Sequence, residues 1–396
     1  MEDWKEYRLD ELYVFGNGLS KGSKYFGYGH PFVSFKTVFN NYFLPEELSD
    51  YVDSDEKEQT KCSVQKSDVL LTRTSETVNE LGYSCVALRD YPKATFNGFC
   101  KRMRPITEGI IHDLYAGYYF RSSHFRNQVC SMSNMVTRAS LSNEMLGRLT
   151  IKLPSYKTQT QIGELLFSID RKIALNRQIN DNLELQAQNI FNHYFIDNPI
   201  ELGSYSEGVL TDIAVYLNGL AMQKFRPEGS DFGLPVLKIK ELGQRSCDNN
   251  SDRCSSLIKE EYIVNDGDVI FSWSGTLLVD LWCGGKCGLN QHLFKVTSDT
   301  YPKWFYYFWT KHHLDNFIRV AKDKAVTMGH IKRTELEKAN IIVPTQDKLS
   351  EINRIMSPII TKIINHRVEM RKLGQLRDII LPQLMSGELK INEIDC

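Results

Sequence analysis

The segment LPSYKTQTQI at residues 153–162 recurs as VPTQDKLSEI at residues 343–352, 190 positions further along the chain. Both copies place an apolar residue and a proline before a polar run, and a long amphipathic stretch follows each of them. Internal repeats of this kind mark a chain built from equivalent structural units. The sequence therefore predicts two related halves that each end in a long helix.

Shorter repeats precede these segments in each half. LDELYVFGNGL (Leu9–Leu19) corresponds to LTDIAVYLNGL (Leu210–Leu220), and both end in Asn-Gly-Leu, where Asn-Gly favours a tight turn. PFVSFKTV from Pro31 corresponds to PVLKIKEL from Pro235, and both show the apolar alternation of a half-buried strand. We expect each half to begin with a β-rich module.

Two further repeats place polar residues at the ends of apolar runs. SDVLLTRTS from Ser67 corresponds to GDVIFSWSG from Gly267, and each predicts a strand that enters a polar loop. MVTRASL (Met135–Leu141) corresponds to AVTMGHI (Ala325–Ile331), and the offset of 190 then holds through the helix. The earlier offsets drift, so we expect a variable module followed by a helix of restricted length.

The two predicted helices share a heptad seam, in which residues at spacings of four and three line one face. The seam positions are Ile162, Leu166, Ile169, Ile173, Asn176, Asn180, Leu183, Ala187, Ile190 and Tyr194, repeated as Ile352, Met356, Ile359, Ile363, His366, Met370, Leu373, Arg377, Ile380 and Leu384. Each helix of about 37 residues is roughly 55 Å long and needs a partner along its length. An antiparallel pairing of the two copies satisfies both seams and gives the chain approximate twofold symmetry.

Three polar residues and one proline depart from the apolar pattern of these helices. Asn176, Asn180 and His366 lie in mid-seam, where a buried polar residue costs stability but fixes the register of pairing. We interpret His366 as a packing residue rather than a metal ligand or an acid-base group. Pro358 removes a backbone hydrogen bond and is expected to kink the second helix near Met356.

Length and charge limit the possible functions. The 396 residues favour two domains with connecting segments over a single core. Because 48 Lys+Arg are balanced by 49 Asp+Glu, a nucleic-acid site must come from segregated charge rather than from a basic total. Such segregation is present, since residues 46–58 are rich in Asp and Glu and residues 319–333 in Lys and Arg.

The nine cysteines indicate a reducing compartment rather than a disulfide framework, because their number is odd. No apolar signal stretch opens the sequence, and no apolar run approaches the roughly 20 residues of a membrane span. We therefore expect a cytoplasmic protein. A zinc site is an open alternative, but its candidate ligands have irregular spacing and no counterpart in the first half. These ligands are Cys247, Cys254, Cys283, Cys287 and His292.

The motifs of common catalytic sites are missing. GNGLSKGS (Gly16–Ser23) lacks the glycine and lysine spacing of a phosphate-binding loop, so we interpret it as an ordinary loop. The sequence contains no Pro-Pro pair of an amino-methyltransferase motif, and neither G-x-S-x-G nor H-E-x-x-H. The chain is therefore predicted to carry no catalytic residues.

The order of module and heptad helix, written twice, resembles the specificity subunits of type I restriction-modification systems. The resemblance rests on that order, on the pattern P...Q..I...L...I..KI..N that opens the first helix, and on LRDIILPQLMSGELKI (Leu376–Ile391). It covers essentially the whole chain. It implies an α+β fold with two β-rich target recognition domains in pseudo-twofold arrangement, separated by two long helices that form an antiparallel coiled coil.

The resemblance also implies a function and a set of partners. Each recognition domain would read one half of a bipartite, asymmetric sequence in double-stranded DNA. The helices would set the spacer length and dock two modification subunits, which transfer a methyl group to adenine. Restriction subunits would add translocation and cleavage. S-adenosylmethionine, ATP and Mg would belong to these partners, with no cofactor or metal in this chain, which is non-catalytic by itself.

Domain boundaries follow from the repeat. We place the first target recognition domain at residues 1–154 and the first spacer helix at residues 155–198. The second recognition domain is placed at residues 199–344, the second helix at residues 345–388, and a tail at residues 389–396.

Candidate DNA contacts are basic and hydroxyl side chains on loops that leave strands. In the first half they are Lys21, Lys24, Thr72, Arg73, Thr74, Thr137 and Arg138. In the second half they are Lys224, Arg226, Ser272, Ser274, Lys322, Lys324, Thr327 and His330, together with the aromatic Trp273 between the two serines. The aromatic runs YAGYYF from Tyr115 and WFYYFW from Trp304 are interpreted as packing segments rather than base-stacking ones.

Two other functions stay open at this point. A structural coiled-coil adaptor without a DNA role would explain the helices, but not two duplicated modules of about 150 residues. A free-standing DNA-modifying enzyme would need catalytic groups that the sequence does not show.

Overall fold

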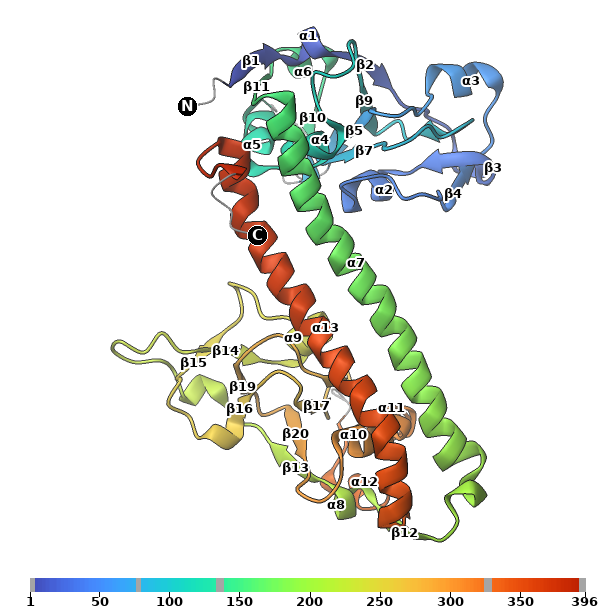
Figure 1. The fold of residues 1–396 in the computed structure, drawn as a ribbon, viewed down its shortest axis with the longest axis vertical. Helices are drawn as coiled ribbons and strands as arrows, with labels where there is room; N and C mark the ends of the chain where they lie inside the picture. Colours follow the sequence, from blue (N-terminus) through green and yellow to red (C-terminus); the bar gives the residue numbers. More distant parts are fainter. Residues whose placement is uncertain (1–3, 76–79, 133–138, 324–329, 392–396) are drawn as a thin grey trace. The chain divides into compact units, whose positions relative to one another are not determined.

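The computed structural model describes residues 4–75, 80–132, 139–323 and 330–391 (Figure 1). Its contacts divide the chain into two compact units, which are described separately below. Unit 1 comprises Met1–Arg171 together with Gly374–Cys396, and unit 2 comprises Lys172–Leu373. Each of the two long helices, α7 (Tyr156–Asn192) and α13 (Gln346–Ser386), therefore contributes one end to each unit.

Unit 1 is a β-rich module with short helices between its strands. Its strands are β1 (Lys5–Arg8), β2 (Tyr13–Asn17), β3 (Phe26–Val33), β4 (Asp50–Val52), β5 (Val69–Thr72), β6 (Thr74–Ser75), β7 (Ser84–Val86), β8 (Thr95–Phe96), β9 (Cys100–Pro105), β10 (Ala139–Ser140) and β11 (Thr150–Leu153). Its short helices are α1 (Leu9–Leu12), α2 (Phe35–Asn40), α3 (Glu56–Lys61), α4 (Asp113–Tyr119), α5 (Ser123–Met132) and α6 (Asn143–Gly147).

Unit 2 is likewise a β-rich module with short helices between its strands. Its strands are β12 (Tyr205–Val209), β13 (Val215–Asn218), β14 (Leu234–Leu237), β15 (Arg253–Cys254), β16 (Ile263–Val264), β17 (Val269–Ser272), β18 (Leu278–Leu281), β19 (Cys287–Leu289), β20 (Leu293–Thr297) and β21 (Asn340–Pro344). Its short helices are α8 (Leu210–Ile213), α9 (Ile239–Gln244), α10 (Lys303–His312), α11 (Leu314–Asp323) and α12 (Arg333–Leu336).

The main sheets of the two units have the same strand order. The order β2-β9-β5-β7 in unit 1 corresponds to β13-β20-β17-β18 in unit 2, and all neighbours in both sheets are antiparallel. The parallel pair β3–β8 corresponds to β14–β19. The chain enters and leaves each module through an antiparallel pair, β1–β11 or β12–β21. The paired sequence segments therefore form equivalent structures, and the predicted α+β fold of two β-rich modules on long helices is confirmed.

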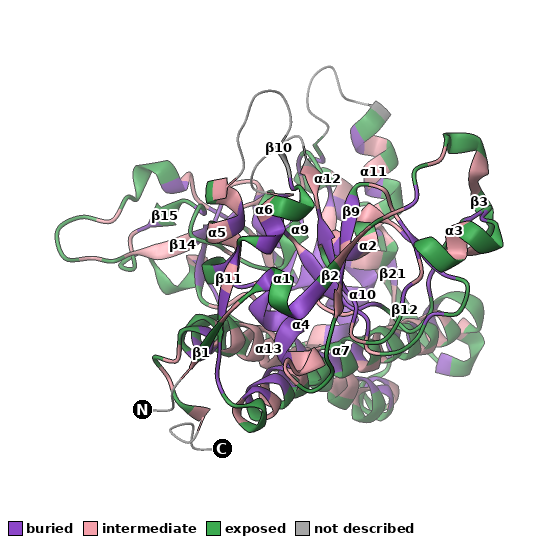
Figure 2. Cartoon of the chain, turned by 90° about the horizontal axis from the view of Figure 1, so that it is seen from above, coloured by how far each residue is buried: buried purple, intermediate pink, exposed green. Residues whose placement is uncertain are grey.

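Aromatic helices fill the space between the sheets and the long helices. In α4, Tyr115, Tyr118 and Tyr119 are buried, and in α10 every residue from Trp304 to Thr310 is buried. Figure 2 shows buried residues gathered in the sheets and in these two helices. The aromatic runs are thus packing segments of the cores, where large rings supply most of the buried apolar area.

The first repeated motif, LPSYKTQTQI, attaches α7 to its module through a buried glutamine. The Gln159 side chain donates to the carbonyl oxygens of Pro154 and Ile110 at 3.0 and 3.1 Å, and it accepts from the amide of His112 at 3.0 Å. The equivalent residue in the second repeat is Leu349, which is buried in the unit 2 core. One repeat therefore anchors its helix by hydrogen bonds and the other by apolar packing.

The helices run antiparallel in unit 2. Asn176 on α7 donates to Glu369 on α13 at 2.7 Å, while Asn180 contacts His366 at 3.0 Å and donates to the Ile363 carbonyl at 3.1 Å. As the number on α7 rises, the number of its partner falls. The side chains that the sequence places in mid-seam are therefore the ones that hold this register.

Unit 1 shows the same sense of pairing. Arg377 on α13 donates to Asp170 on α7 at 2.6 Å, and the Tyr118 hydroxyl of the module donates to the same carboxylate at 2.7 Å. Ile162, near the start of α7, lines a cavity together with Leu384, near the end of α13. The antiparallel coiled coil expected from the sequence is thus present within each unit.

The seam residues face inward along both helices. Ile162, Leu166, Ile169, Ile352, Met356 and Ile363 are buried, and Ile173 and Ile359 are half-buried. Pro358 lies on the exposed side of α13, whose helical assignment runs from Gln346 to Ser386 without a break. The helix therefore continues through this proline, and the kink expected near Met356 stays a prediction. Gly387, with φ of 76°, ends it in the left-handed conformation that glycine favours.

We predict that paired cysteines will report the antiparallel register. Asn176→Cys with Glu369→Cys, and Asn180→Cys with His366→Cys, should each form an intramolecular disulfide on mild oxidation, because both pairs of side chains are in contact. Non-reducing electrophoresis measures the cross-link, with the oxidised parent chain as the blank.

The matched control combines Asn176→Cys with Lys362→Cys. A parallel pairing through the Asn180–His366 contact would bring these two positions together. In the antiparallel register Lys362 lies seven residues from Glu369, about 10 Å along the helix, beyond the reach of a disulfide. A cross-link in this control, with none between positions 176 and 369, would contradict the observed pairing, whereas the pair at positions 180 and 366 is in contact in either sense.

Candidate nucleic-acid interface

In both units, the asparagine of the Asn-Gly-Leu turn binds the loop that follows the central buried strand. In unit 1, Asn17 Oδ1 accepts from Lys101 Nζ at 2.6 Å and from Arg73 Nη1 at 3.4 Å. In unit 2, Asn218 Oδ1 accepts from Trp273 Nε1 at 2.9 Å. The asparagine of the duplicated turn thus accepts hydrogen bonds from two cationic side chains in unit 1 and from an indole ring in unit 2.

A second turn packs against the first in each unit. The amide of Phe99 donates to Asn97 Oδ1 at 2.8 Å, and the amide of His292 donates to Asn290 Oδ1 at 3.3 Å. Each of these turns presents an aromatic ring at its tip. Their shared geometry shows that the segments Asn97–Phe99 and Asn290–His292 are equivalent.

The strand-exit residue joins the two turns to a third segment. Arg73 donates its amide to the Phe99 carbonyl at 2.9 Å, and its carbonyl accepts from Leu141 at 2.9 Å. In unit 2, Trp273 makes the corresponding bonds to His292 at 3.4 Å and Ile331 at 3.1 Å. Three loops far apart in the sequence therefore converge at one end of each main sheet.

Two glycines allow the turns to approach this closely. A Cβ atom on Gly18 would lie 2.1 Å from the Asn97 carbonyl oxygen, and one on Gly219 would lie 2.3 Å from the Asn290 carbonyl oxygen. These contacts are with backbone atoms, so no side-chain rotation relieves them. The glycine of Asn-Gly-Leu is thus required for the contact between turns.

We call the resulting groups turn cluster 1 and turn cluster 2. Turn cluster 1 consists of Asn17, Arg73, Phe99, Lys101 and Asn143. Turn cluster 2 consists of Asn218, Trp273, Ser274, His292 and His330. Asn17, Arg73 and Phe99 correspond in backbone position to Asn218, Trp273 and His292, and the clusters differ in side-chain chemistry.

Turn cluster 1 is cationic. Lys101 is almost fully buried, and its ammonium group donates to the neutral amides of Asn17 and Asn143. Burial, with a contribution from the neighbouring Arg73, lowers the pKa of Lys101. Within the part of the chain that the structure describes, neither cation has a carboxylate partner. Their uncompensated charge suits an anionic group such as a DNA phosphate.

Turn cluster 2 is polar and aromatic. His292 Nδ1 lies 3.1 Å from Ser274 Oγ, and the Trp273 ring lies 6.0 Å from the His292 ring and 6.4 Å from the His330 ring. Gln291, at the tip of the same turn, is half-buried. Amide and imidazole groups of this kind form hydrogen bonds with base edges.

Three hydroxyl residues proposed as DNA contacts from the sequence are buried. The Thr72 hydroxyl donates to the Glu80 carbonyl at 2.7 Å, and the Ser272 hydroxyl donates to the Ser274 carbonyl at 3.2 Å. Ser274 is also buried, against His292. These hydroxyls form hydrogen bonds within the strand-exit loop, as hydroxyl side chains next to a strand end often do. Their role as DNA contacts stays a prediction.

The basic candidates have different surroundings. Lys21 donates to the Asp53 carbonyl and pairs with Glu58 at 2.6 Å, and this carboxylate raises the pKa of the lysine. Lys24, Lys224 and Lys322 are exposed. Arg226 is exposed beside a cavity of about 360 Å³ in unit 2.

The remaining candidates lie within the clusters or outside the described residues. Arg73 and His330 are members of turn clusters 1 and 2. Thr74, half-buried in β6, pairs with β10. Thr137, Arg138, Lys324 and Thr327 lie outside the described residues.

Sequence reasoning missed several members of the clusters. The Asn17 and Asn218 side chains were taken only as turn formers, and Lys101 was not among the candidate residues. The signal for the second turn was present, because FNGF at residues 96–99 aligns with LNQH at residues 289–292. The match is only four residues long, so the two segments are recognised as equivalent only when the pairing of the surrounding strands is known.

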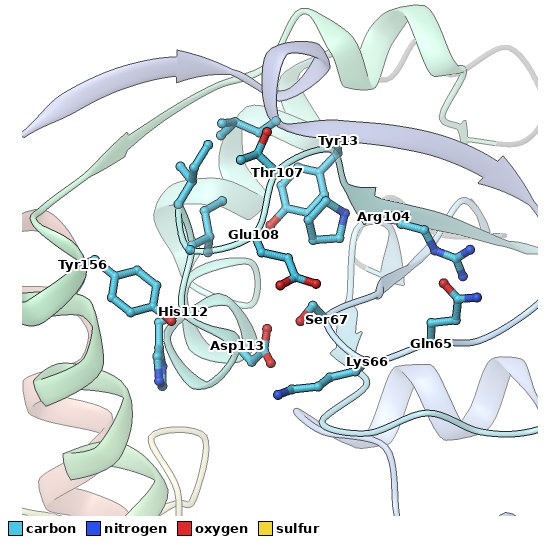
Figure 3. A pocket seen from close by; sticks show the side chains of 15 residues that line it. Tyr13, Gln65, Lys66, Ser67, Arg104, Thr107, Glu108, His112, Asp113 and Tyr156 are labelled. Carbon is cyan, nitrogen blue, oxygen red and sulfur yellow. The ribbon is translucent and has the colours of Figure 1, made fainter.

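Unit 1 contains a cavity that is larger than the one beside Arg226 and lies apart from turn cluster 1. It measures about 580 Å³, and Glu108, Asp113 and Lys66 converge on its opening (Figure 3). Arg104 on its wall is paired with the buried Asp68 at 2.6 Å and also contacts Ser63. The lining mixes both signs of charge, and we assign no ligand to it.

Neither a metal site nor a membrane span emerges from the described ranges. No group of three His, Cys, Asp or Glu side chains there is placed to hold a metal ion. The alternative zinc ligands are used otherwise, since His292 pairs with Ser274 and Cys247 with Cys287. Among the same residues, no helix is both long and apolar enough to cross a membrane.

These features define the class of the protein. It is a duplicated α+β protein whose two units share a pair of antiparallel helices, and each unit carries one turn cluster at the end of its main sheet. Comparison with known protein families also finds a duplication. The family model described as type I restriction modification DNA specificity domain matches residues 1–185 and again residues 207–372. The chain belongs to this family, as the resemblance in its sequence indicated.

Individual relatives match over nearly the whole chain. The chain is 24% identical over 428 residues to the type I restriction enzyme MjaIX specificity subunit of Methanocaldococcus jannaschii, covering 99% of this chain and 95% of that protein. It is 22% identical over 391 residues to the EcoKI specificity subunit of Escherichia coli (strain K12), covering 88% and 78%. The crystal structure of the type I restriction-modification system S subunit from M. genitalium has the same fold, with a TM-score of 0.65, 12% identity and 96% of each chain covered.

We predict that the contact between turns depends on Gly18. Gly18→Ala should lower the free energy of unfolding by about 1–3 kcal/mol, because the added methyl group collides with a backbone carbonyl. The midpoint of urea unfolding measures the loss. Gly22→Ala is the matched control, since a Cβ there meets no atom within 4 Å. Equal midpoints for the two variants would show that the turns do not pack as described.

Proposed function

We propose that the chain is the DNA sequence-recognition subunit of a type I restriction-modification complex, in which each unit reads one half of a bipartite target. The observation that carries the proposal is the pair of turn clusters, which occupy equivalent positions in two copies of one fold. Duplex DNA with two half-sites is the ligand that such a duplication suits. Their different side chains suit an asymmetric target.

The division of the chain follows from this role. We place the target recognition domains at residues 1–154 and 199–344, the spacer helices at residues 155–198 and 345–388, and a tail at residues 389–396. Supporting this, the paired strands β1–β11 and β12–β21 end at Leu153 and Pro344, just before α7 and α13 begin.

The long helices are proposed to dock two modification subunits and to set the spacer. Several large apolar side chains on them are exposed even though the seams are buried. They are Leu175 and Leu185 on α7 and Ile355, Leu376 and Ile379 on α13. Such residues suit a protein partner.

Chemistry is assigned to the partners. The modification subunits would bind S-adenosylmethionine and methylate adenine, and restriction subunits would use ATP and Mg. The chain itself is then non-catalytic and acts in the cytoplasm. The eight cysteines that the structure describes are free thiols, which suits this compartment.

We predict that removing the charge of Arg73 weakens DNA binding by the assembled complex. Arg73→Gln should reduce the dependence of the logarithm of affinity on the logarithm of salt concentration by about 1, the effect of one lost phosphate contact. Arg89→Gln is the matched control, because it makes the same change of charge at an exposed site against Tyr91 in the same unit. Equal slopes for both variants would remove turn cluster 1 from the interface.

We also predict that spacer length follows helix length. Seven residues inserted after Arg171 in α7 and after Leu373 in α13 add about 10 Å of helix and keep the heptad phase. Both insertions fall at the boundary between the units, so the contacts described within each unit are preserved. The gap between half-sites should grow by about 3 base pairs of about 3.4 Å each. A map of methylated adenines measures it. An unchanged gap would show that the helices do not set the spacer.

A further inference from the structure

Phe99 is an exposed aromatic residue on an ordered turn of turn cluster 1. Its side chain is 55% exposed, although rings of this size are usually placed in the core. A single exposed apolar residue is ordinary on a mobile loop. At Phe99, however, the backbone is held on every side.

Hydrogen bonds fix the turn around Phe99. Its amide is bound to Asn97 Oδ1 and its carbonyl to the amide of Arg73. Gly98 donates to the Leu19 carbonyl at 2.8 Å, and Cys100 donates to the Asn97 carbonyl at 2.9 Å. The ring is therefore presented in one backbone conformation, and little entropy is lost when it is used in binding.

The charges beside this ring indicate its partner. Lys101 follows Phe99 two residues along the chain, and Arg73 donates its amide to the Phe99 carbonyl at 2.9 Å. The described residues supply no carboxylate to either cation. Arg73 Nε is buried and has no hydrogen-bond partner. An apolar ring on the same cluster as two unneutralised cations suits a polymer with phosphates outside and apolar base surfaces inside.

The equivalent position in unit 2 lacks this feature. His292 occupies the tip of the corresponding turn, but it is half-buried, and its ring nitrogens contact Ser274 and Gln291. The two units therefore present different chemistry at one structural position. An apolar ring stands in the first unit and a hydrogen-bonding group in the second.

We propose that Phe99 is a specificity-determining residue that contacts the apolar surface of bases in the first half-site. The proposal rests on the proposed function of DNA recognition. The ring has no hydrogen-bonding group, so it discriminates bases by contact with a thymine methyl group or by insertion between base pairs. Unit 2 does not use this contact.

The test compares Phe99→Ala with Ile106→Ala in the assembled complex. The two residues flank strand β9 at opposite ends and are similarly exposed, at 55% and 53%. A map of methylated adenines gives the preference at each position of both half-sites. Phe99→Ala should reduce the preference at one or two adjacent positions of the first half-site about tenfold to a hundredfold. The second half-site should be unchanged, and Ile106→Ala should leave both unchanged.

Two DNA probes separate the forms of apolar contact. Uracil in place of thymine at the affected position should weaken binding by the parent complex and not by the Phe99→Ala complex if the ring meets the methyl group. 2-Aminopurine there should brighten on binding by the parent complex alone if the ring unstacks the bases. If methylation by Phe99→Ala is too weak to map, competition between target and random duplex measures the same loss of preference.

The results also separate this inference from the proposed function. An unchanged first half-site in Phe99→Ala, from a complex that still methylates a bipartite target, overturns the role of Phe99 alone. A parent complex without sequence-specific methylation overturns the proposed function. If Phe99→Ala instead loses preference in the second half-site, the ring does not read the first half-site, and the inference is also overturned.

Discussion

The two long helices each bury a heptad seam, and the rest of the chain is attached to that seam. In unit 2, Ala187 and Phe191 of α7 and Ile352 and Met356 of α13 belong to one apolar core with the aromatic helix α10. In unit 1, Gly163 of α7 approaches α4 so closely that a Cβ would lie 2.8 Å from the Tyr115 amide nitrogen. Each helix thus has to fit two modules, one at each end. A shift of one residue would rotate its seam by about 100° and disturb both.

Polar groups fix the register of this pairing rather than strengthen it. Arg367 is buried in unit 2, where it donates to Glu184 at 2.6 Å and to Asp280 at 2.8 Å. Burial by itself would lower the pKa of Arg367, and the two carboxylates raise it. Replacing a single member of such a network costs about 3–5 kcal/mol, because a charge is left unpaired. The network joins both helices to strand β18, so the module is held at a defined position on them.

The helices and modules are predictable from the sequence because a seam and an alternating strand repeat with regular periods. The drifting offsets before Leu141 and the constant offset after it correspond to variable loops followed by paired helices. The interface is less predictable. Thr72 and Ser272 are predicted from the sequence as DNA contacts, and in the structure both hydroxyls are buried and bound to backbone carbonyl oxygens, which a sequence pattern does not reveal. Lys101 and Phe99 escaped notice because their role depends on three loops meeting in space.

Equivalence of the two modules is the central claim, and duplication of one module tests it most directly. A chain in which residues 5–154 are replaced by a second copy of residues 205–344 keeps the strand pair that leads into each long helix. A map of methylated adenines made by the assembled enzyme then gives its target. The account predicts a palindromic target, in which the half-site of unit 2 appears twice in inverted orientation with the parent spacer. Two half-sites in direct repeat, or a target that retains the parent first half-site, would contradict it.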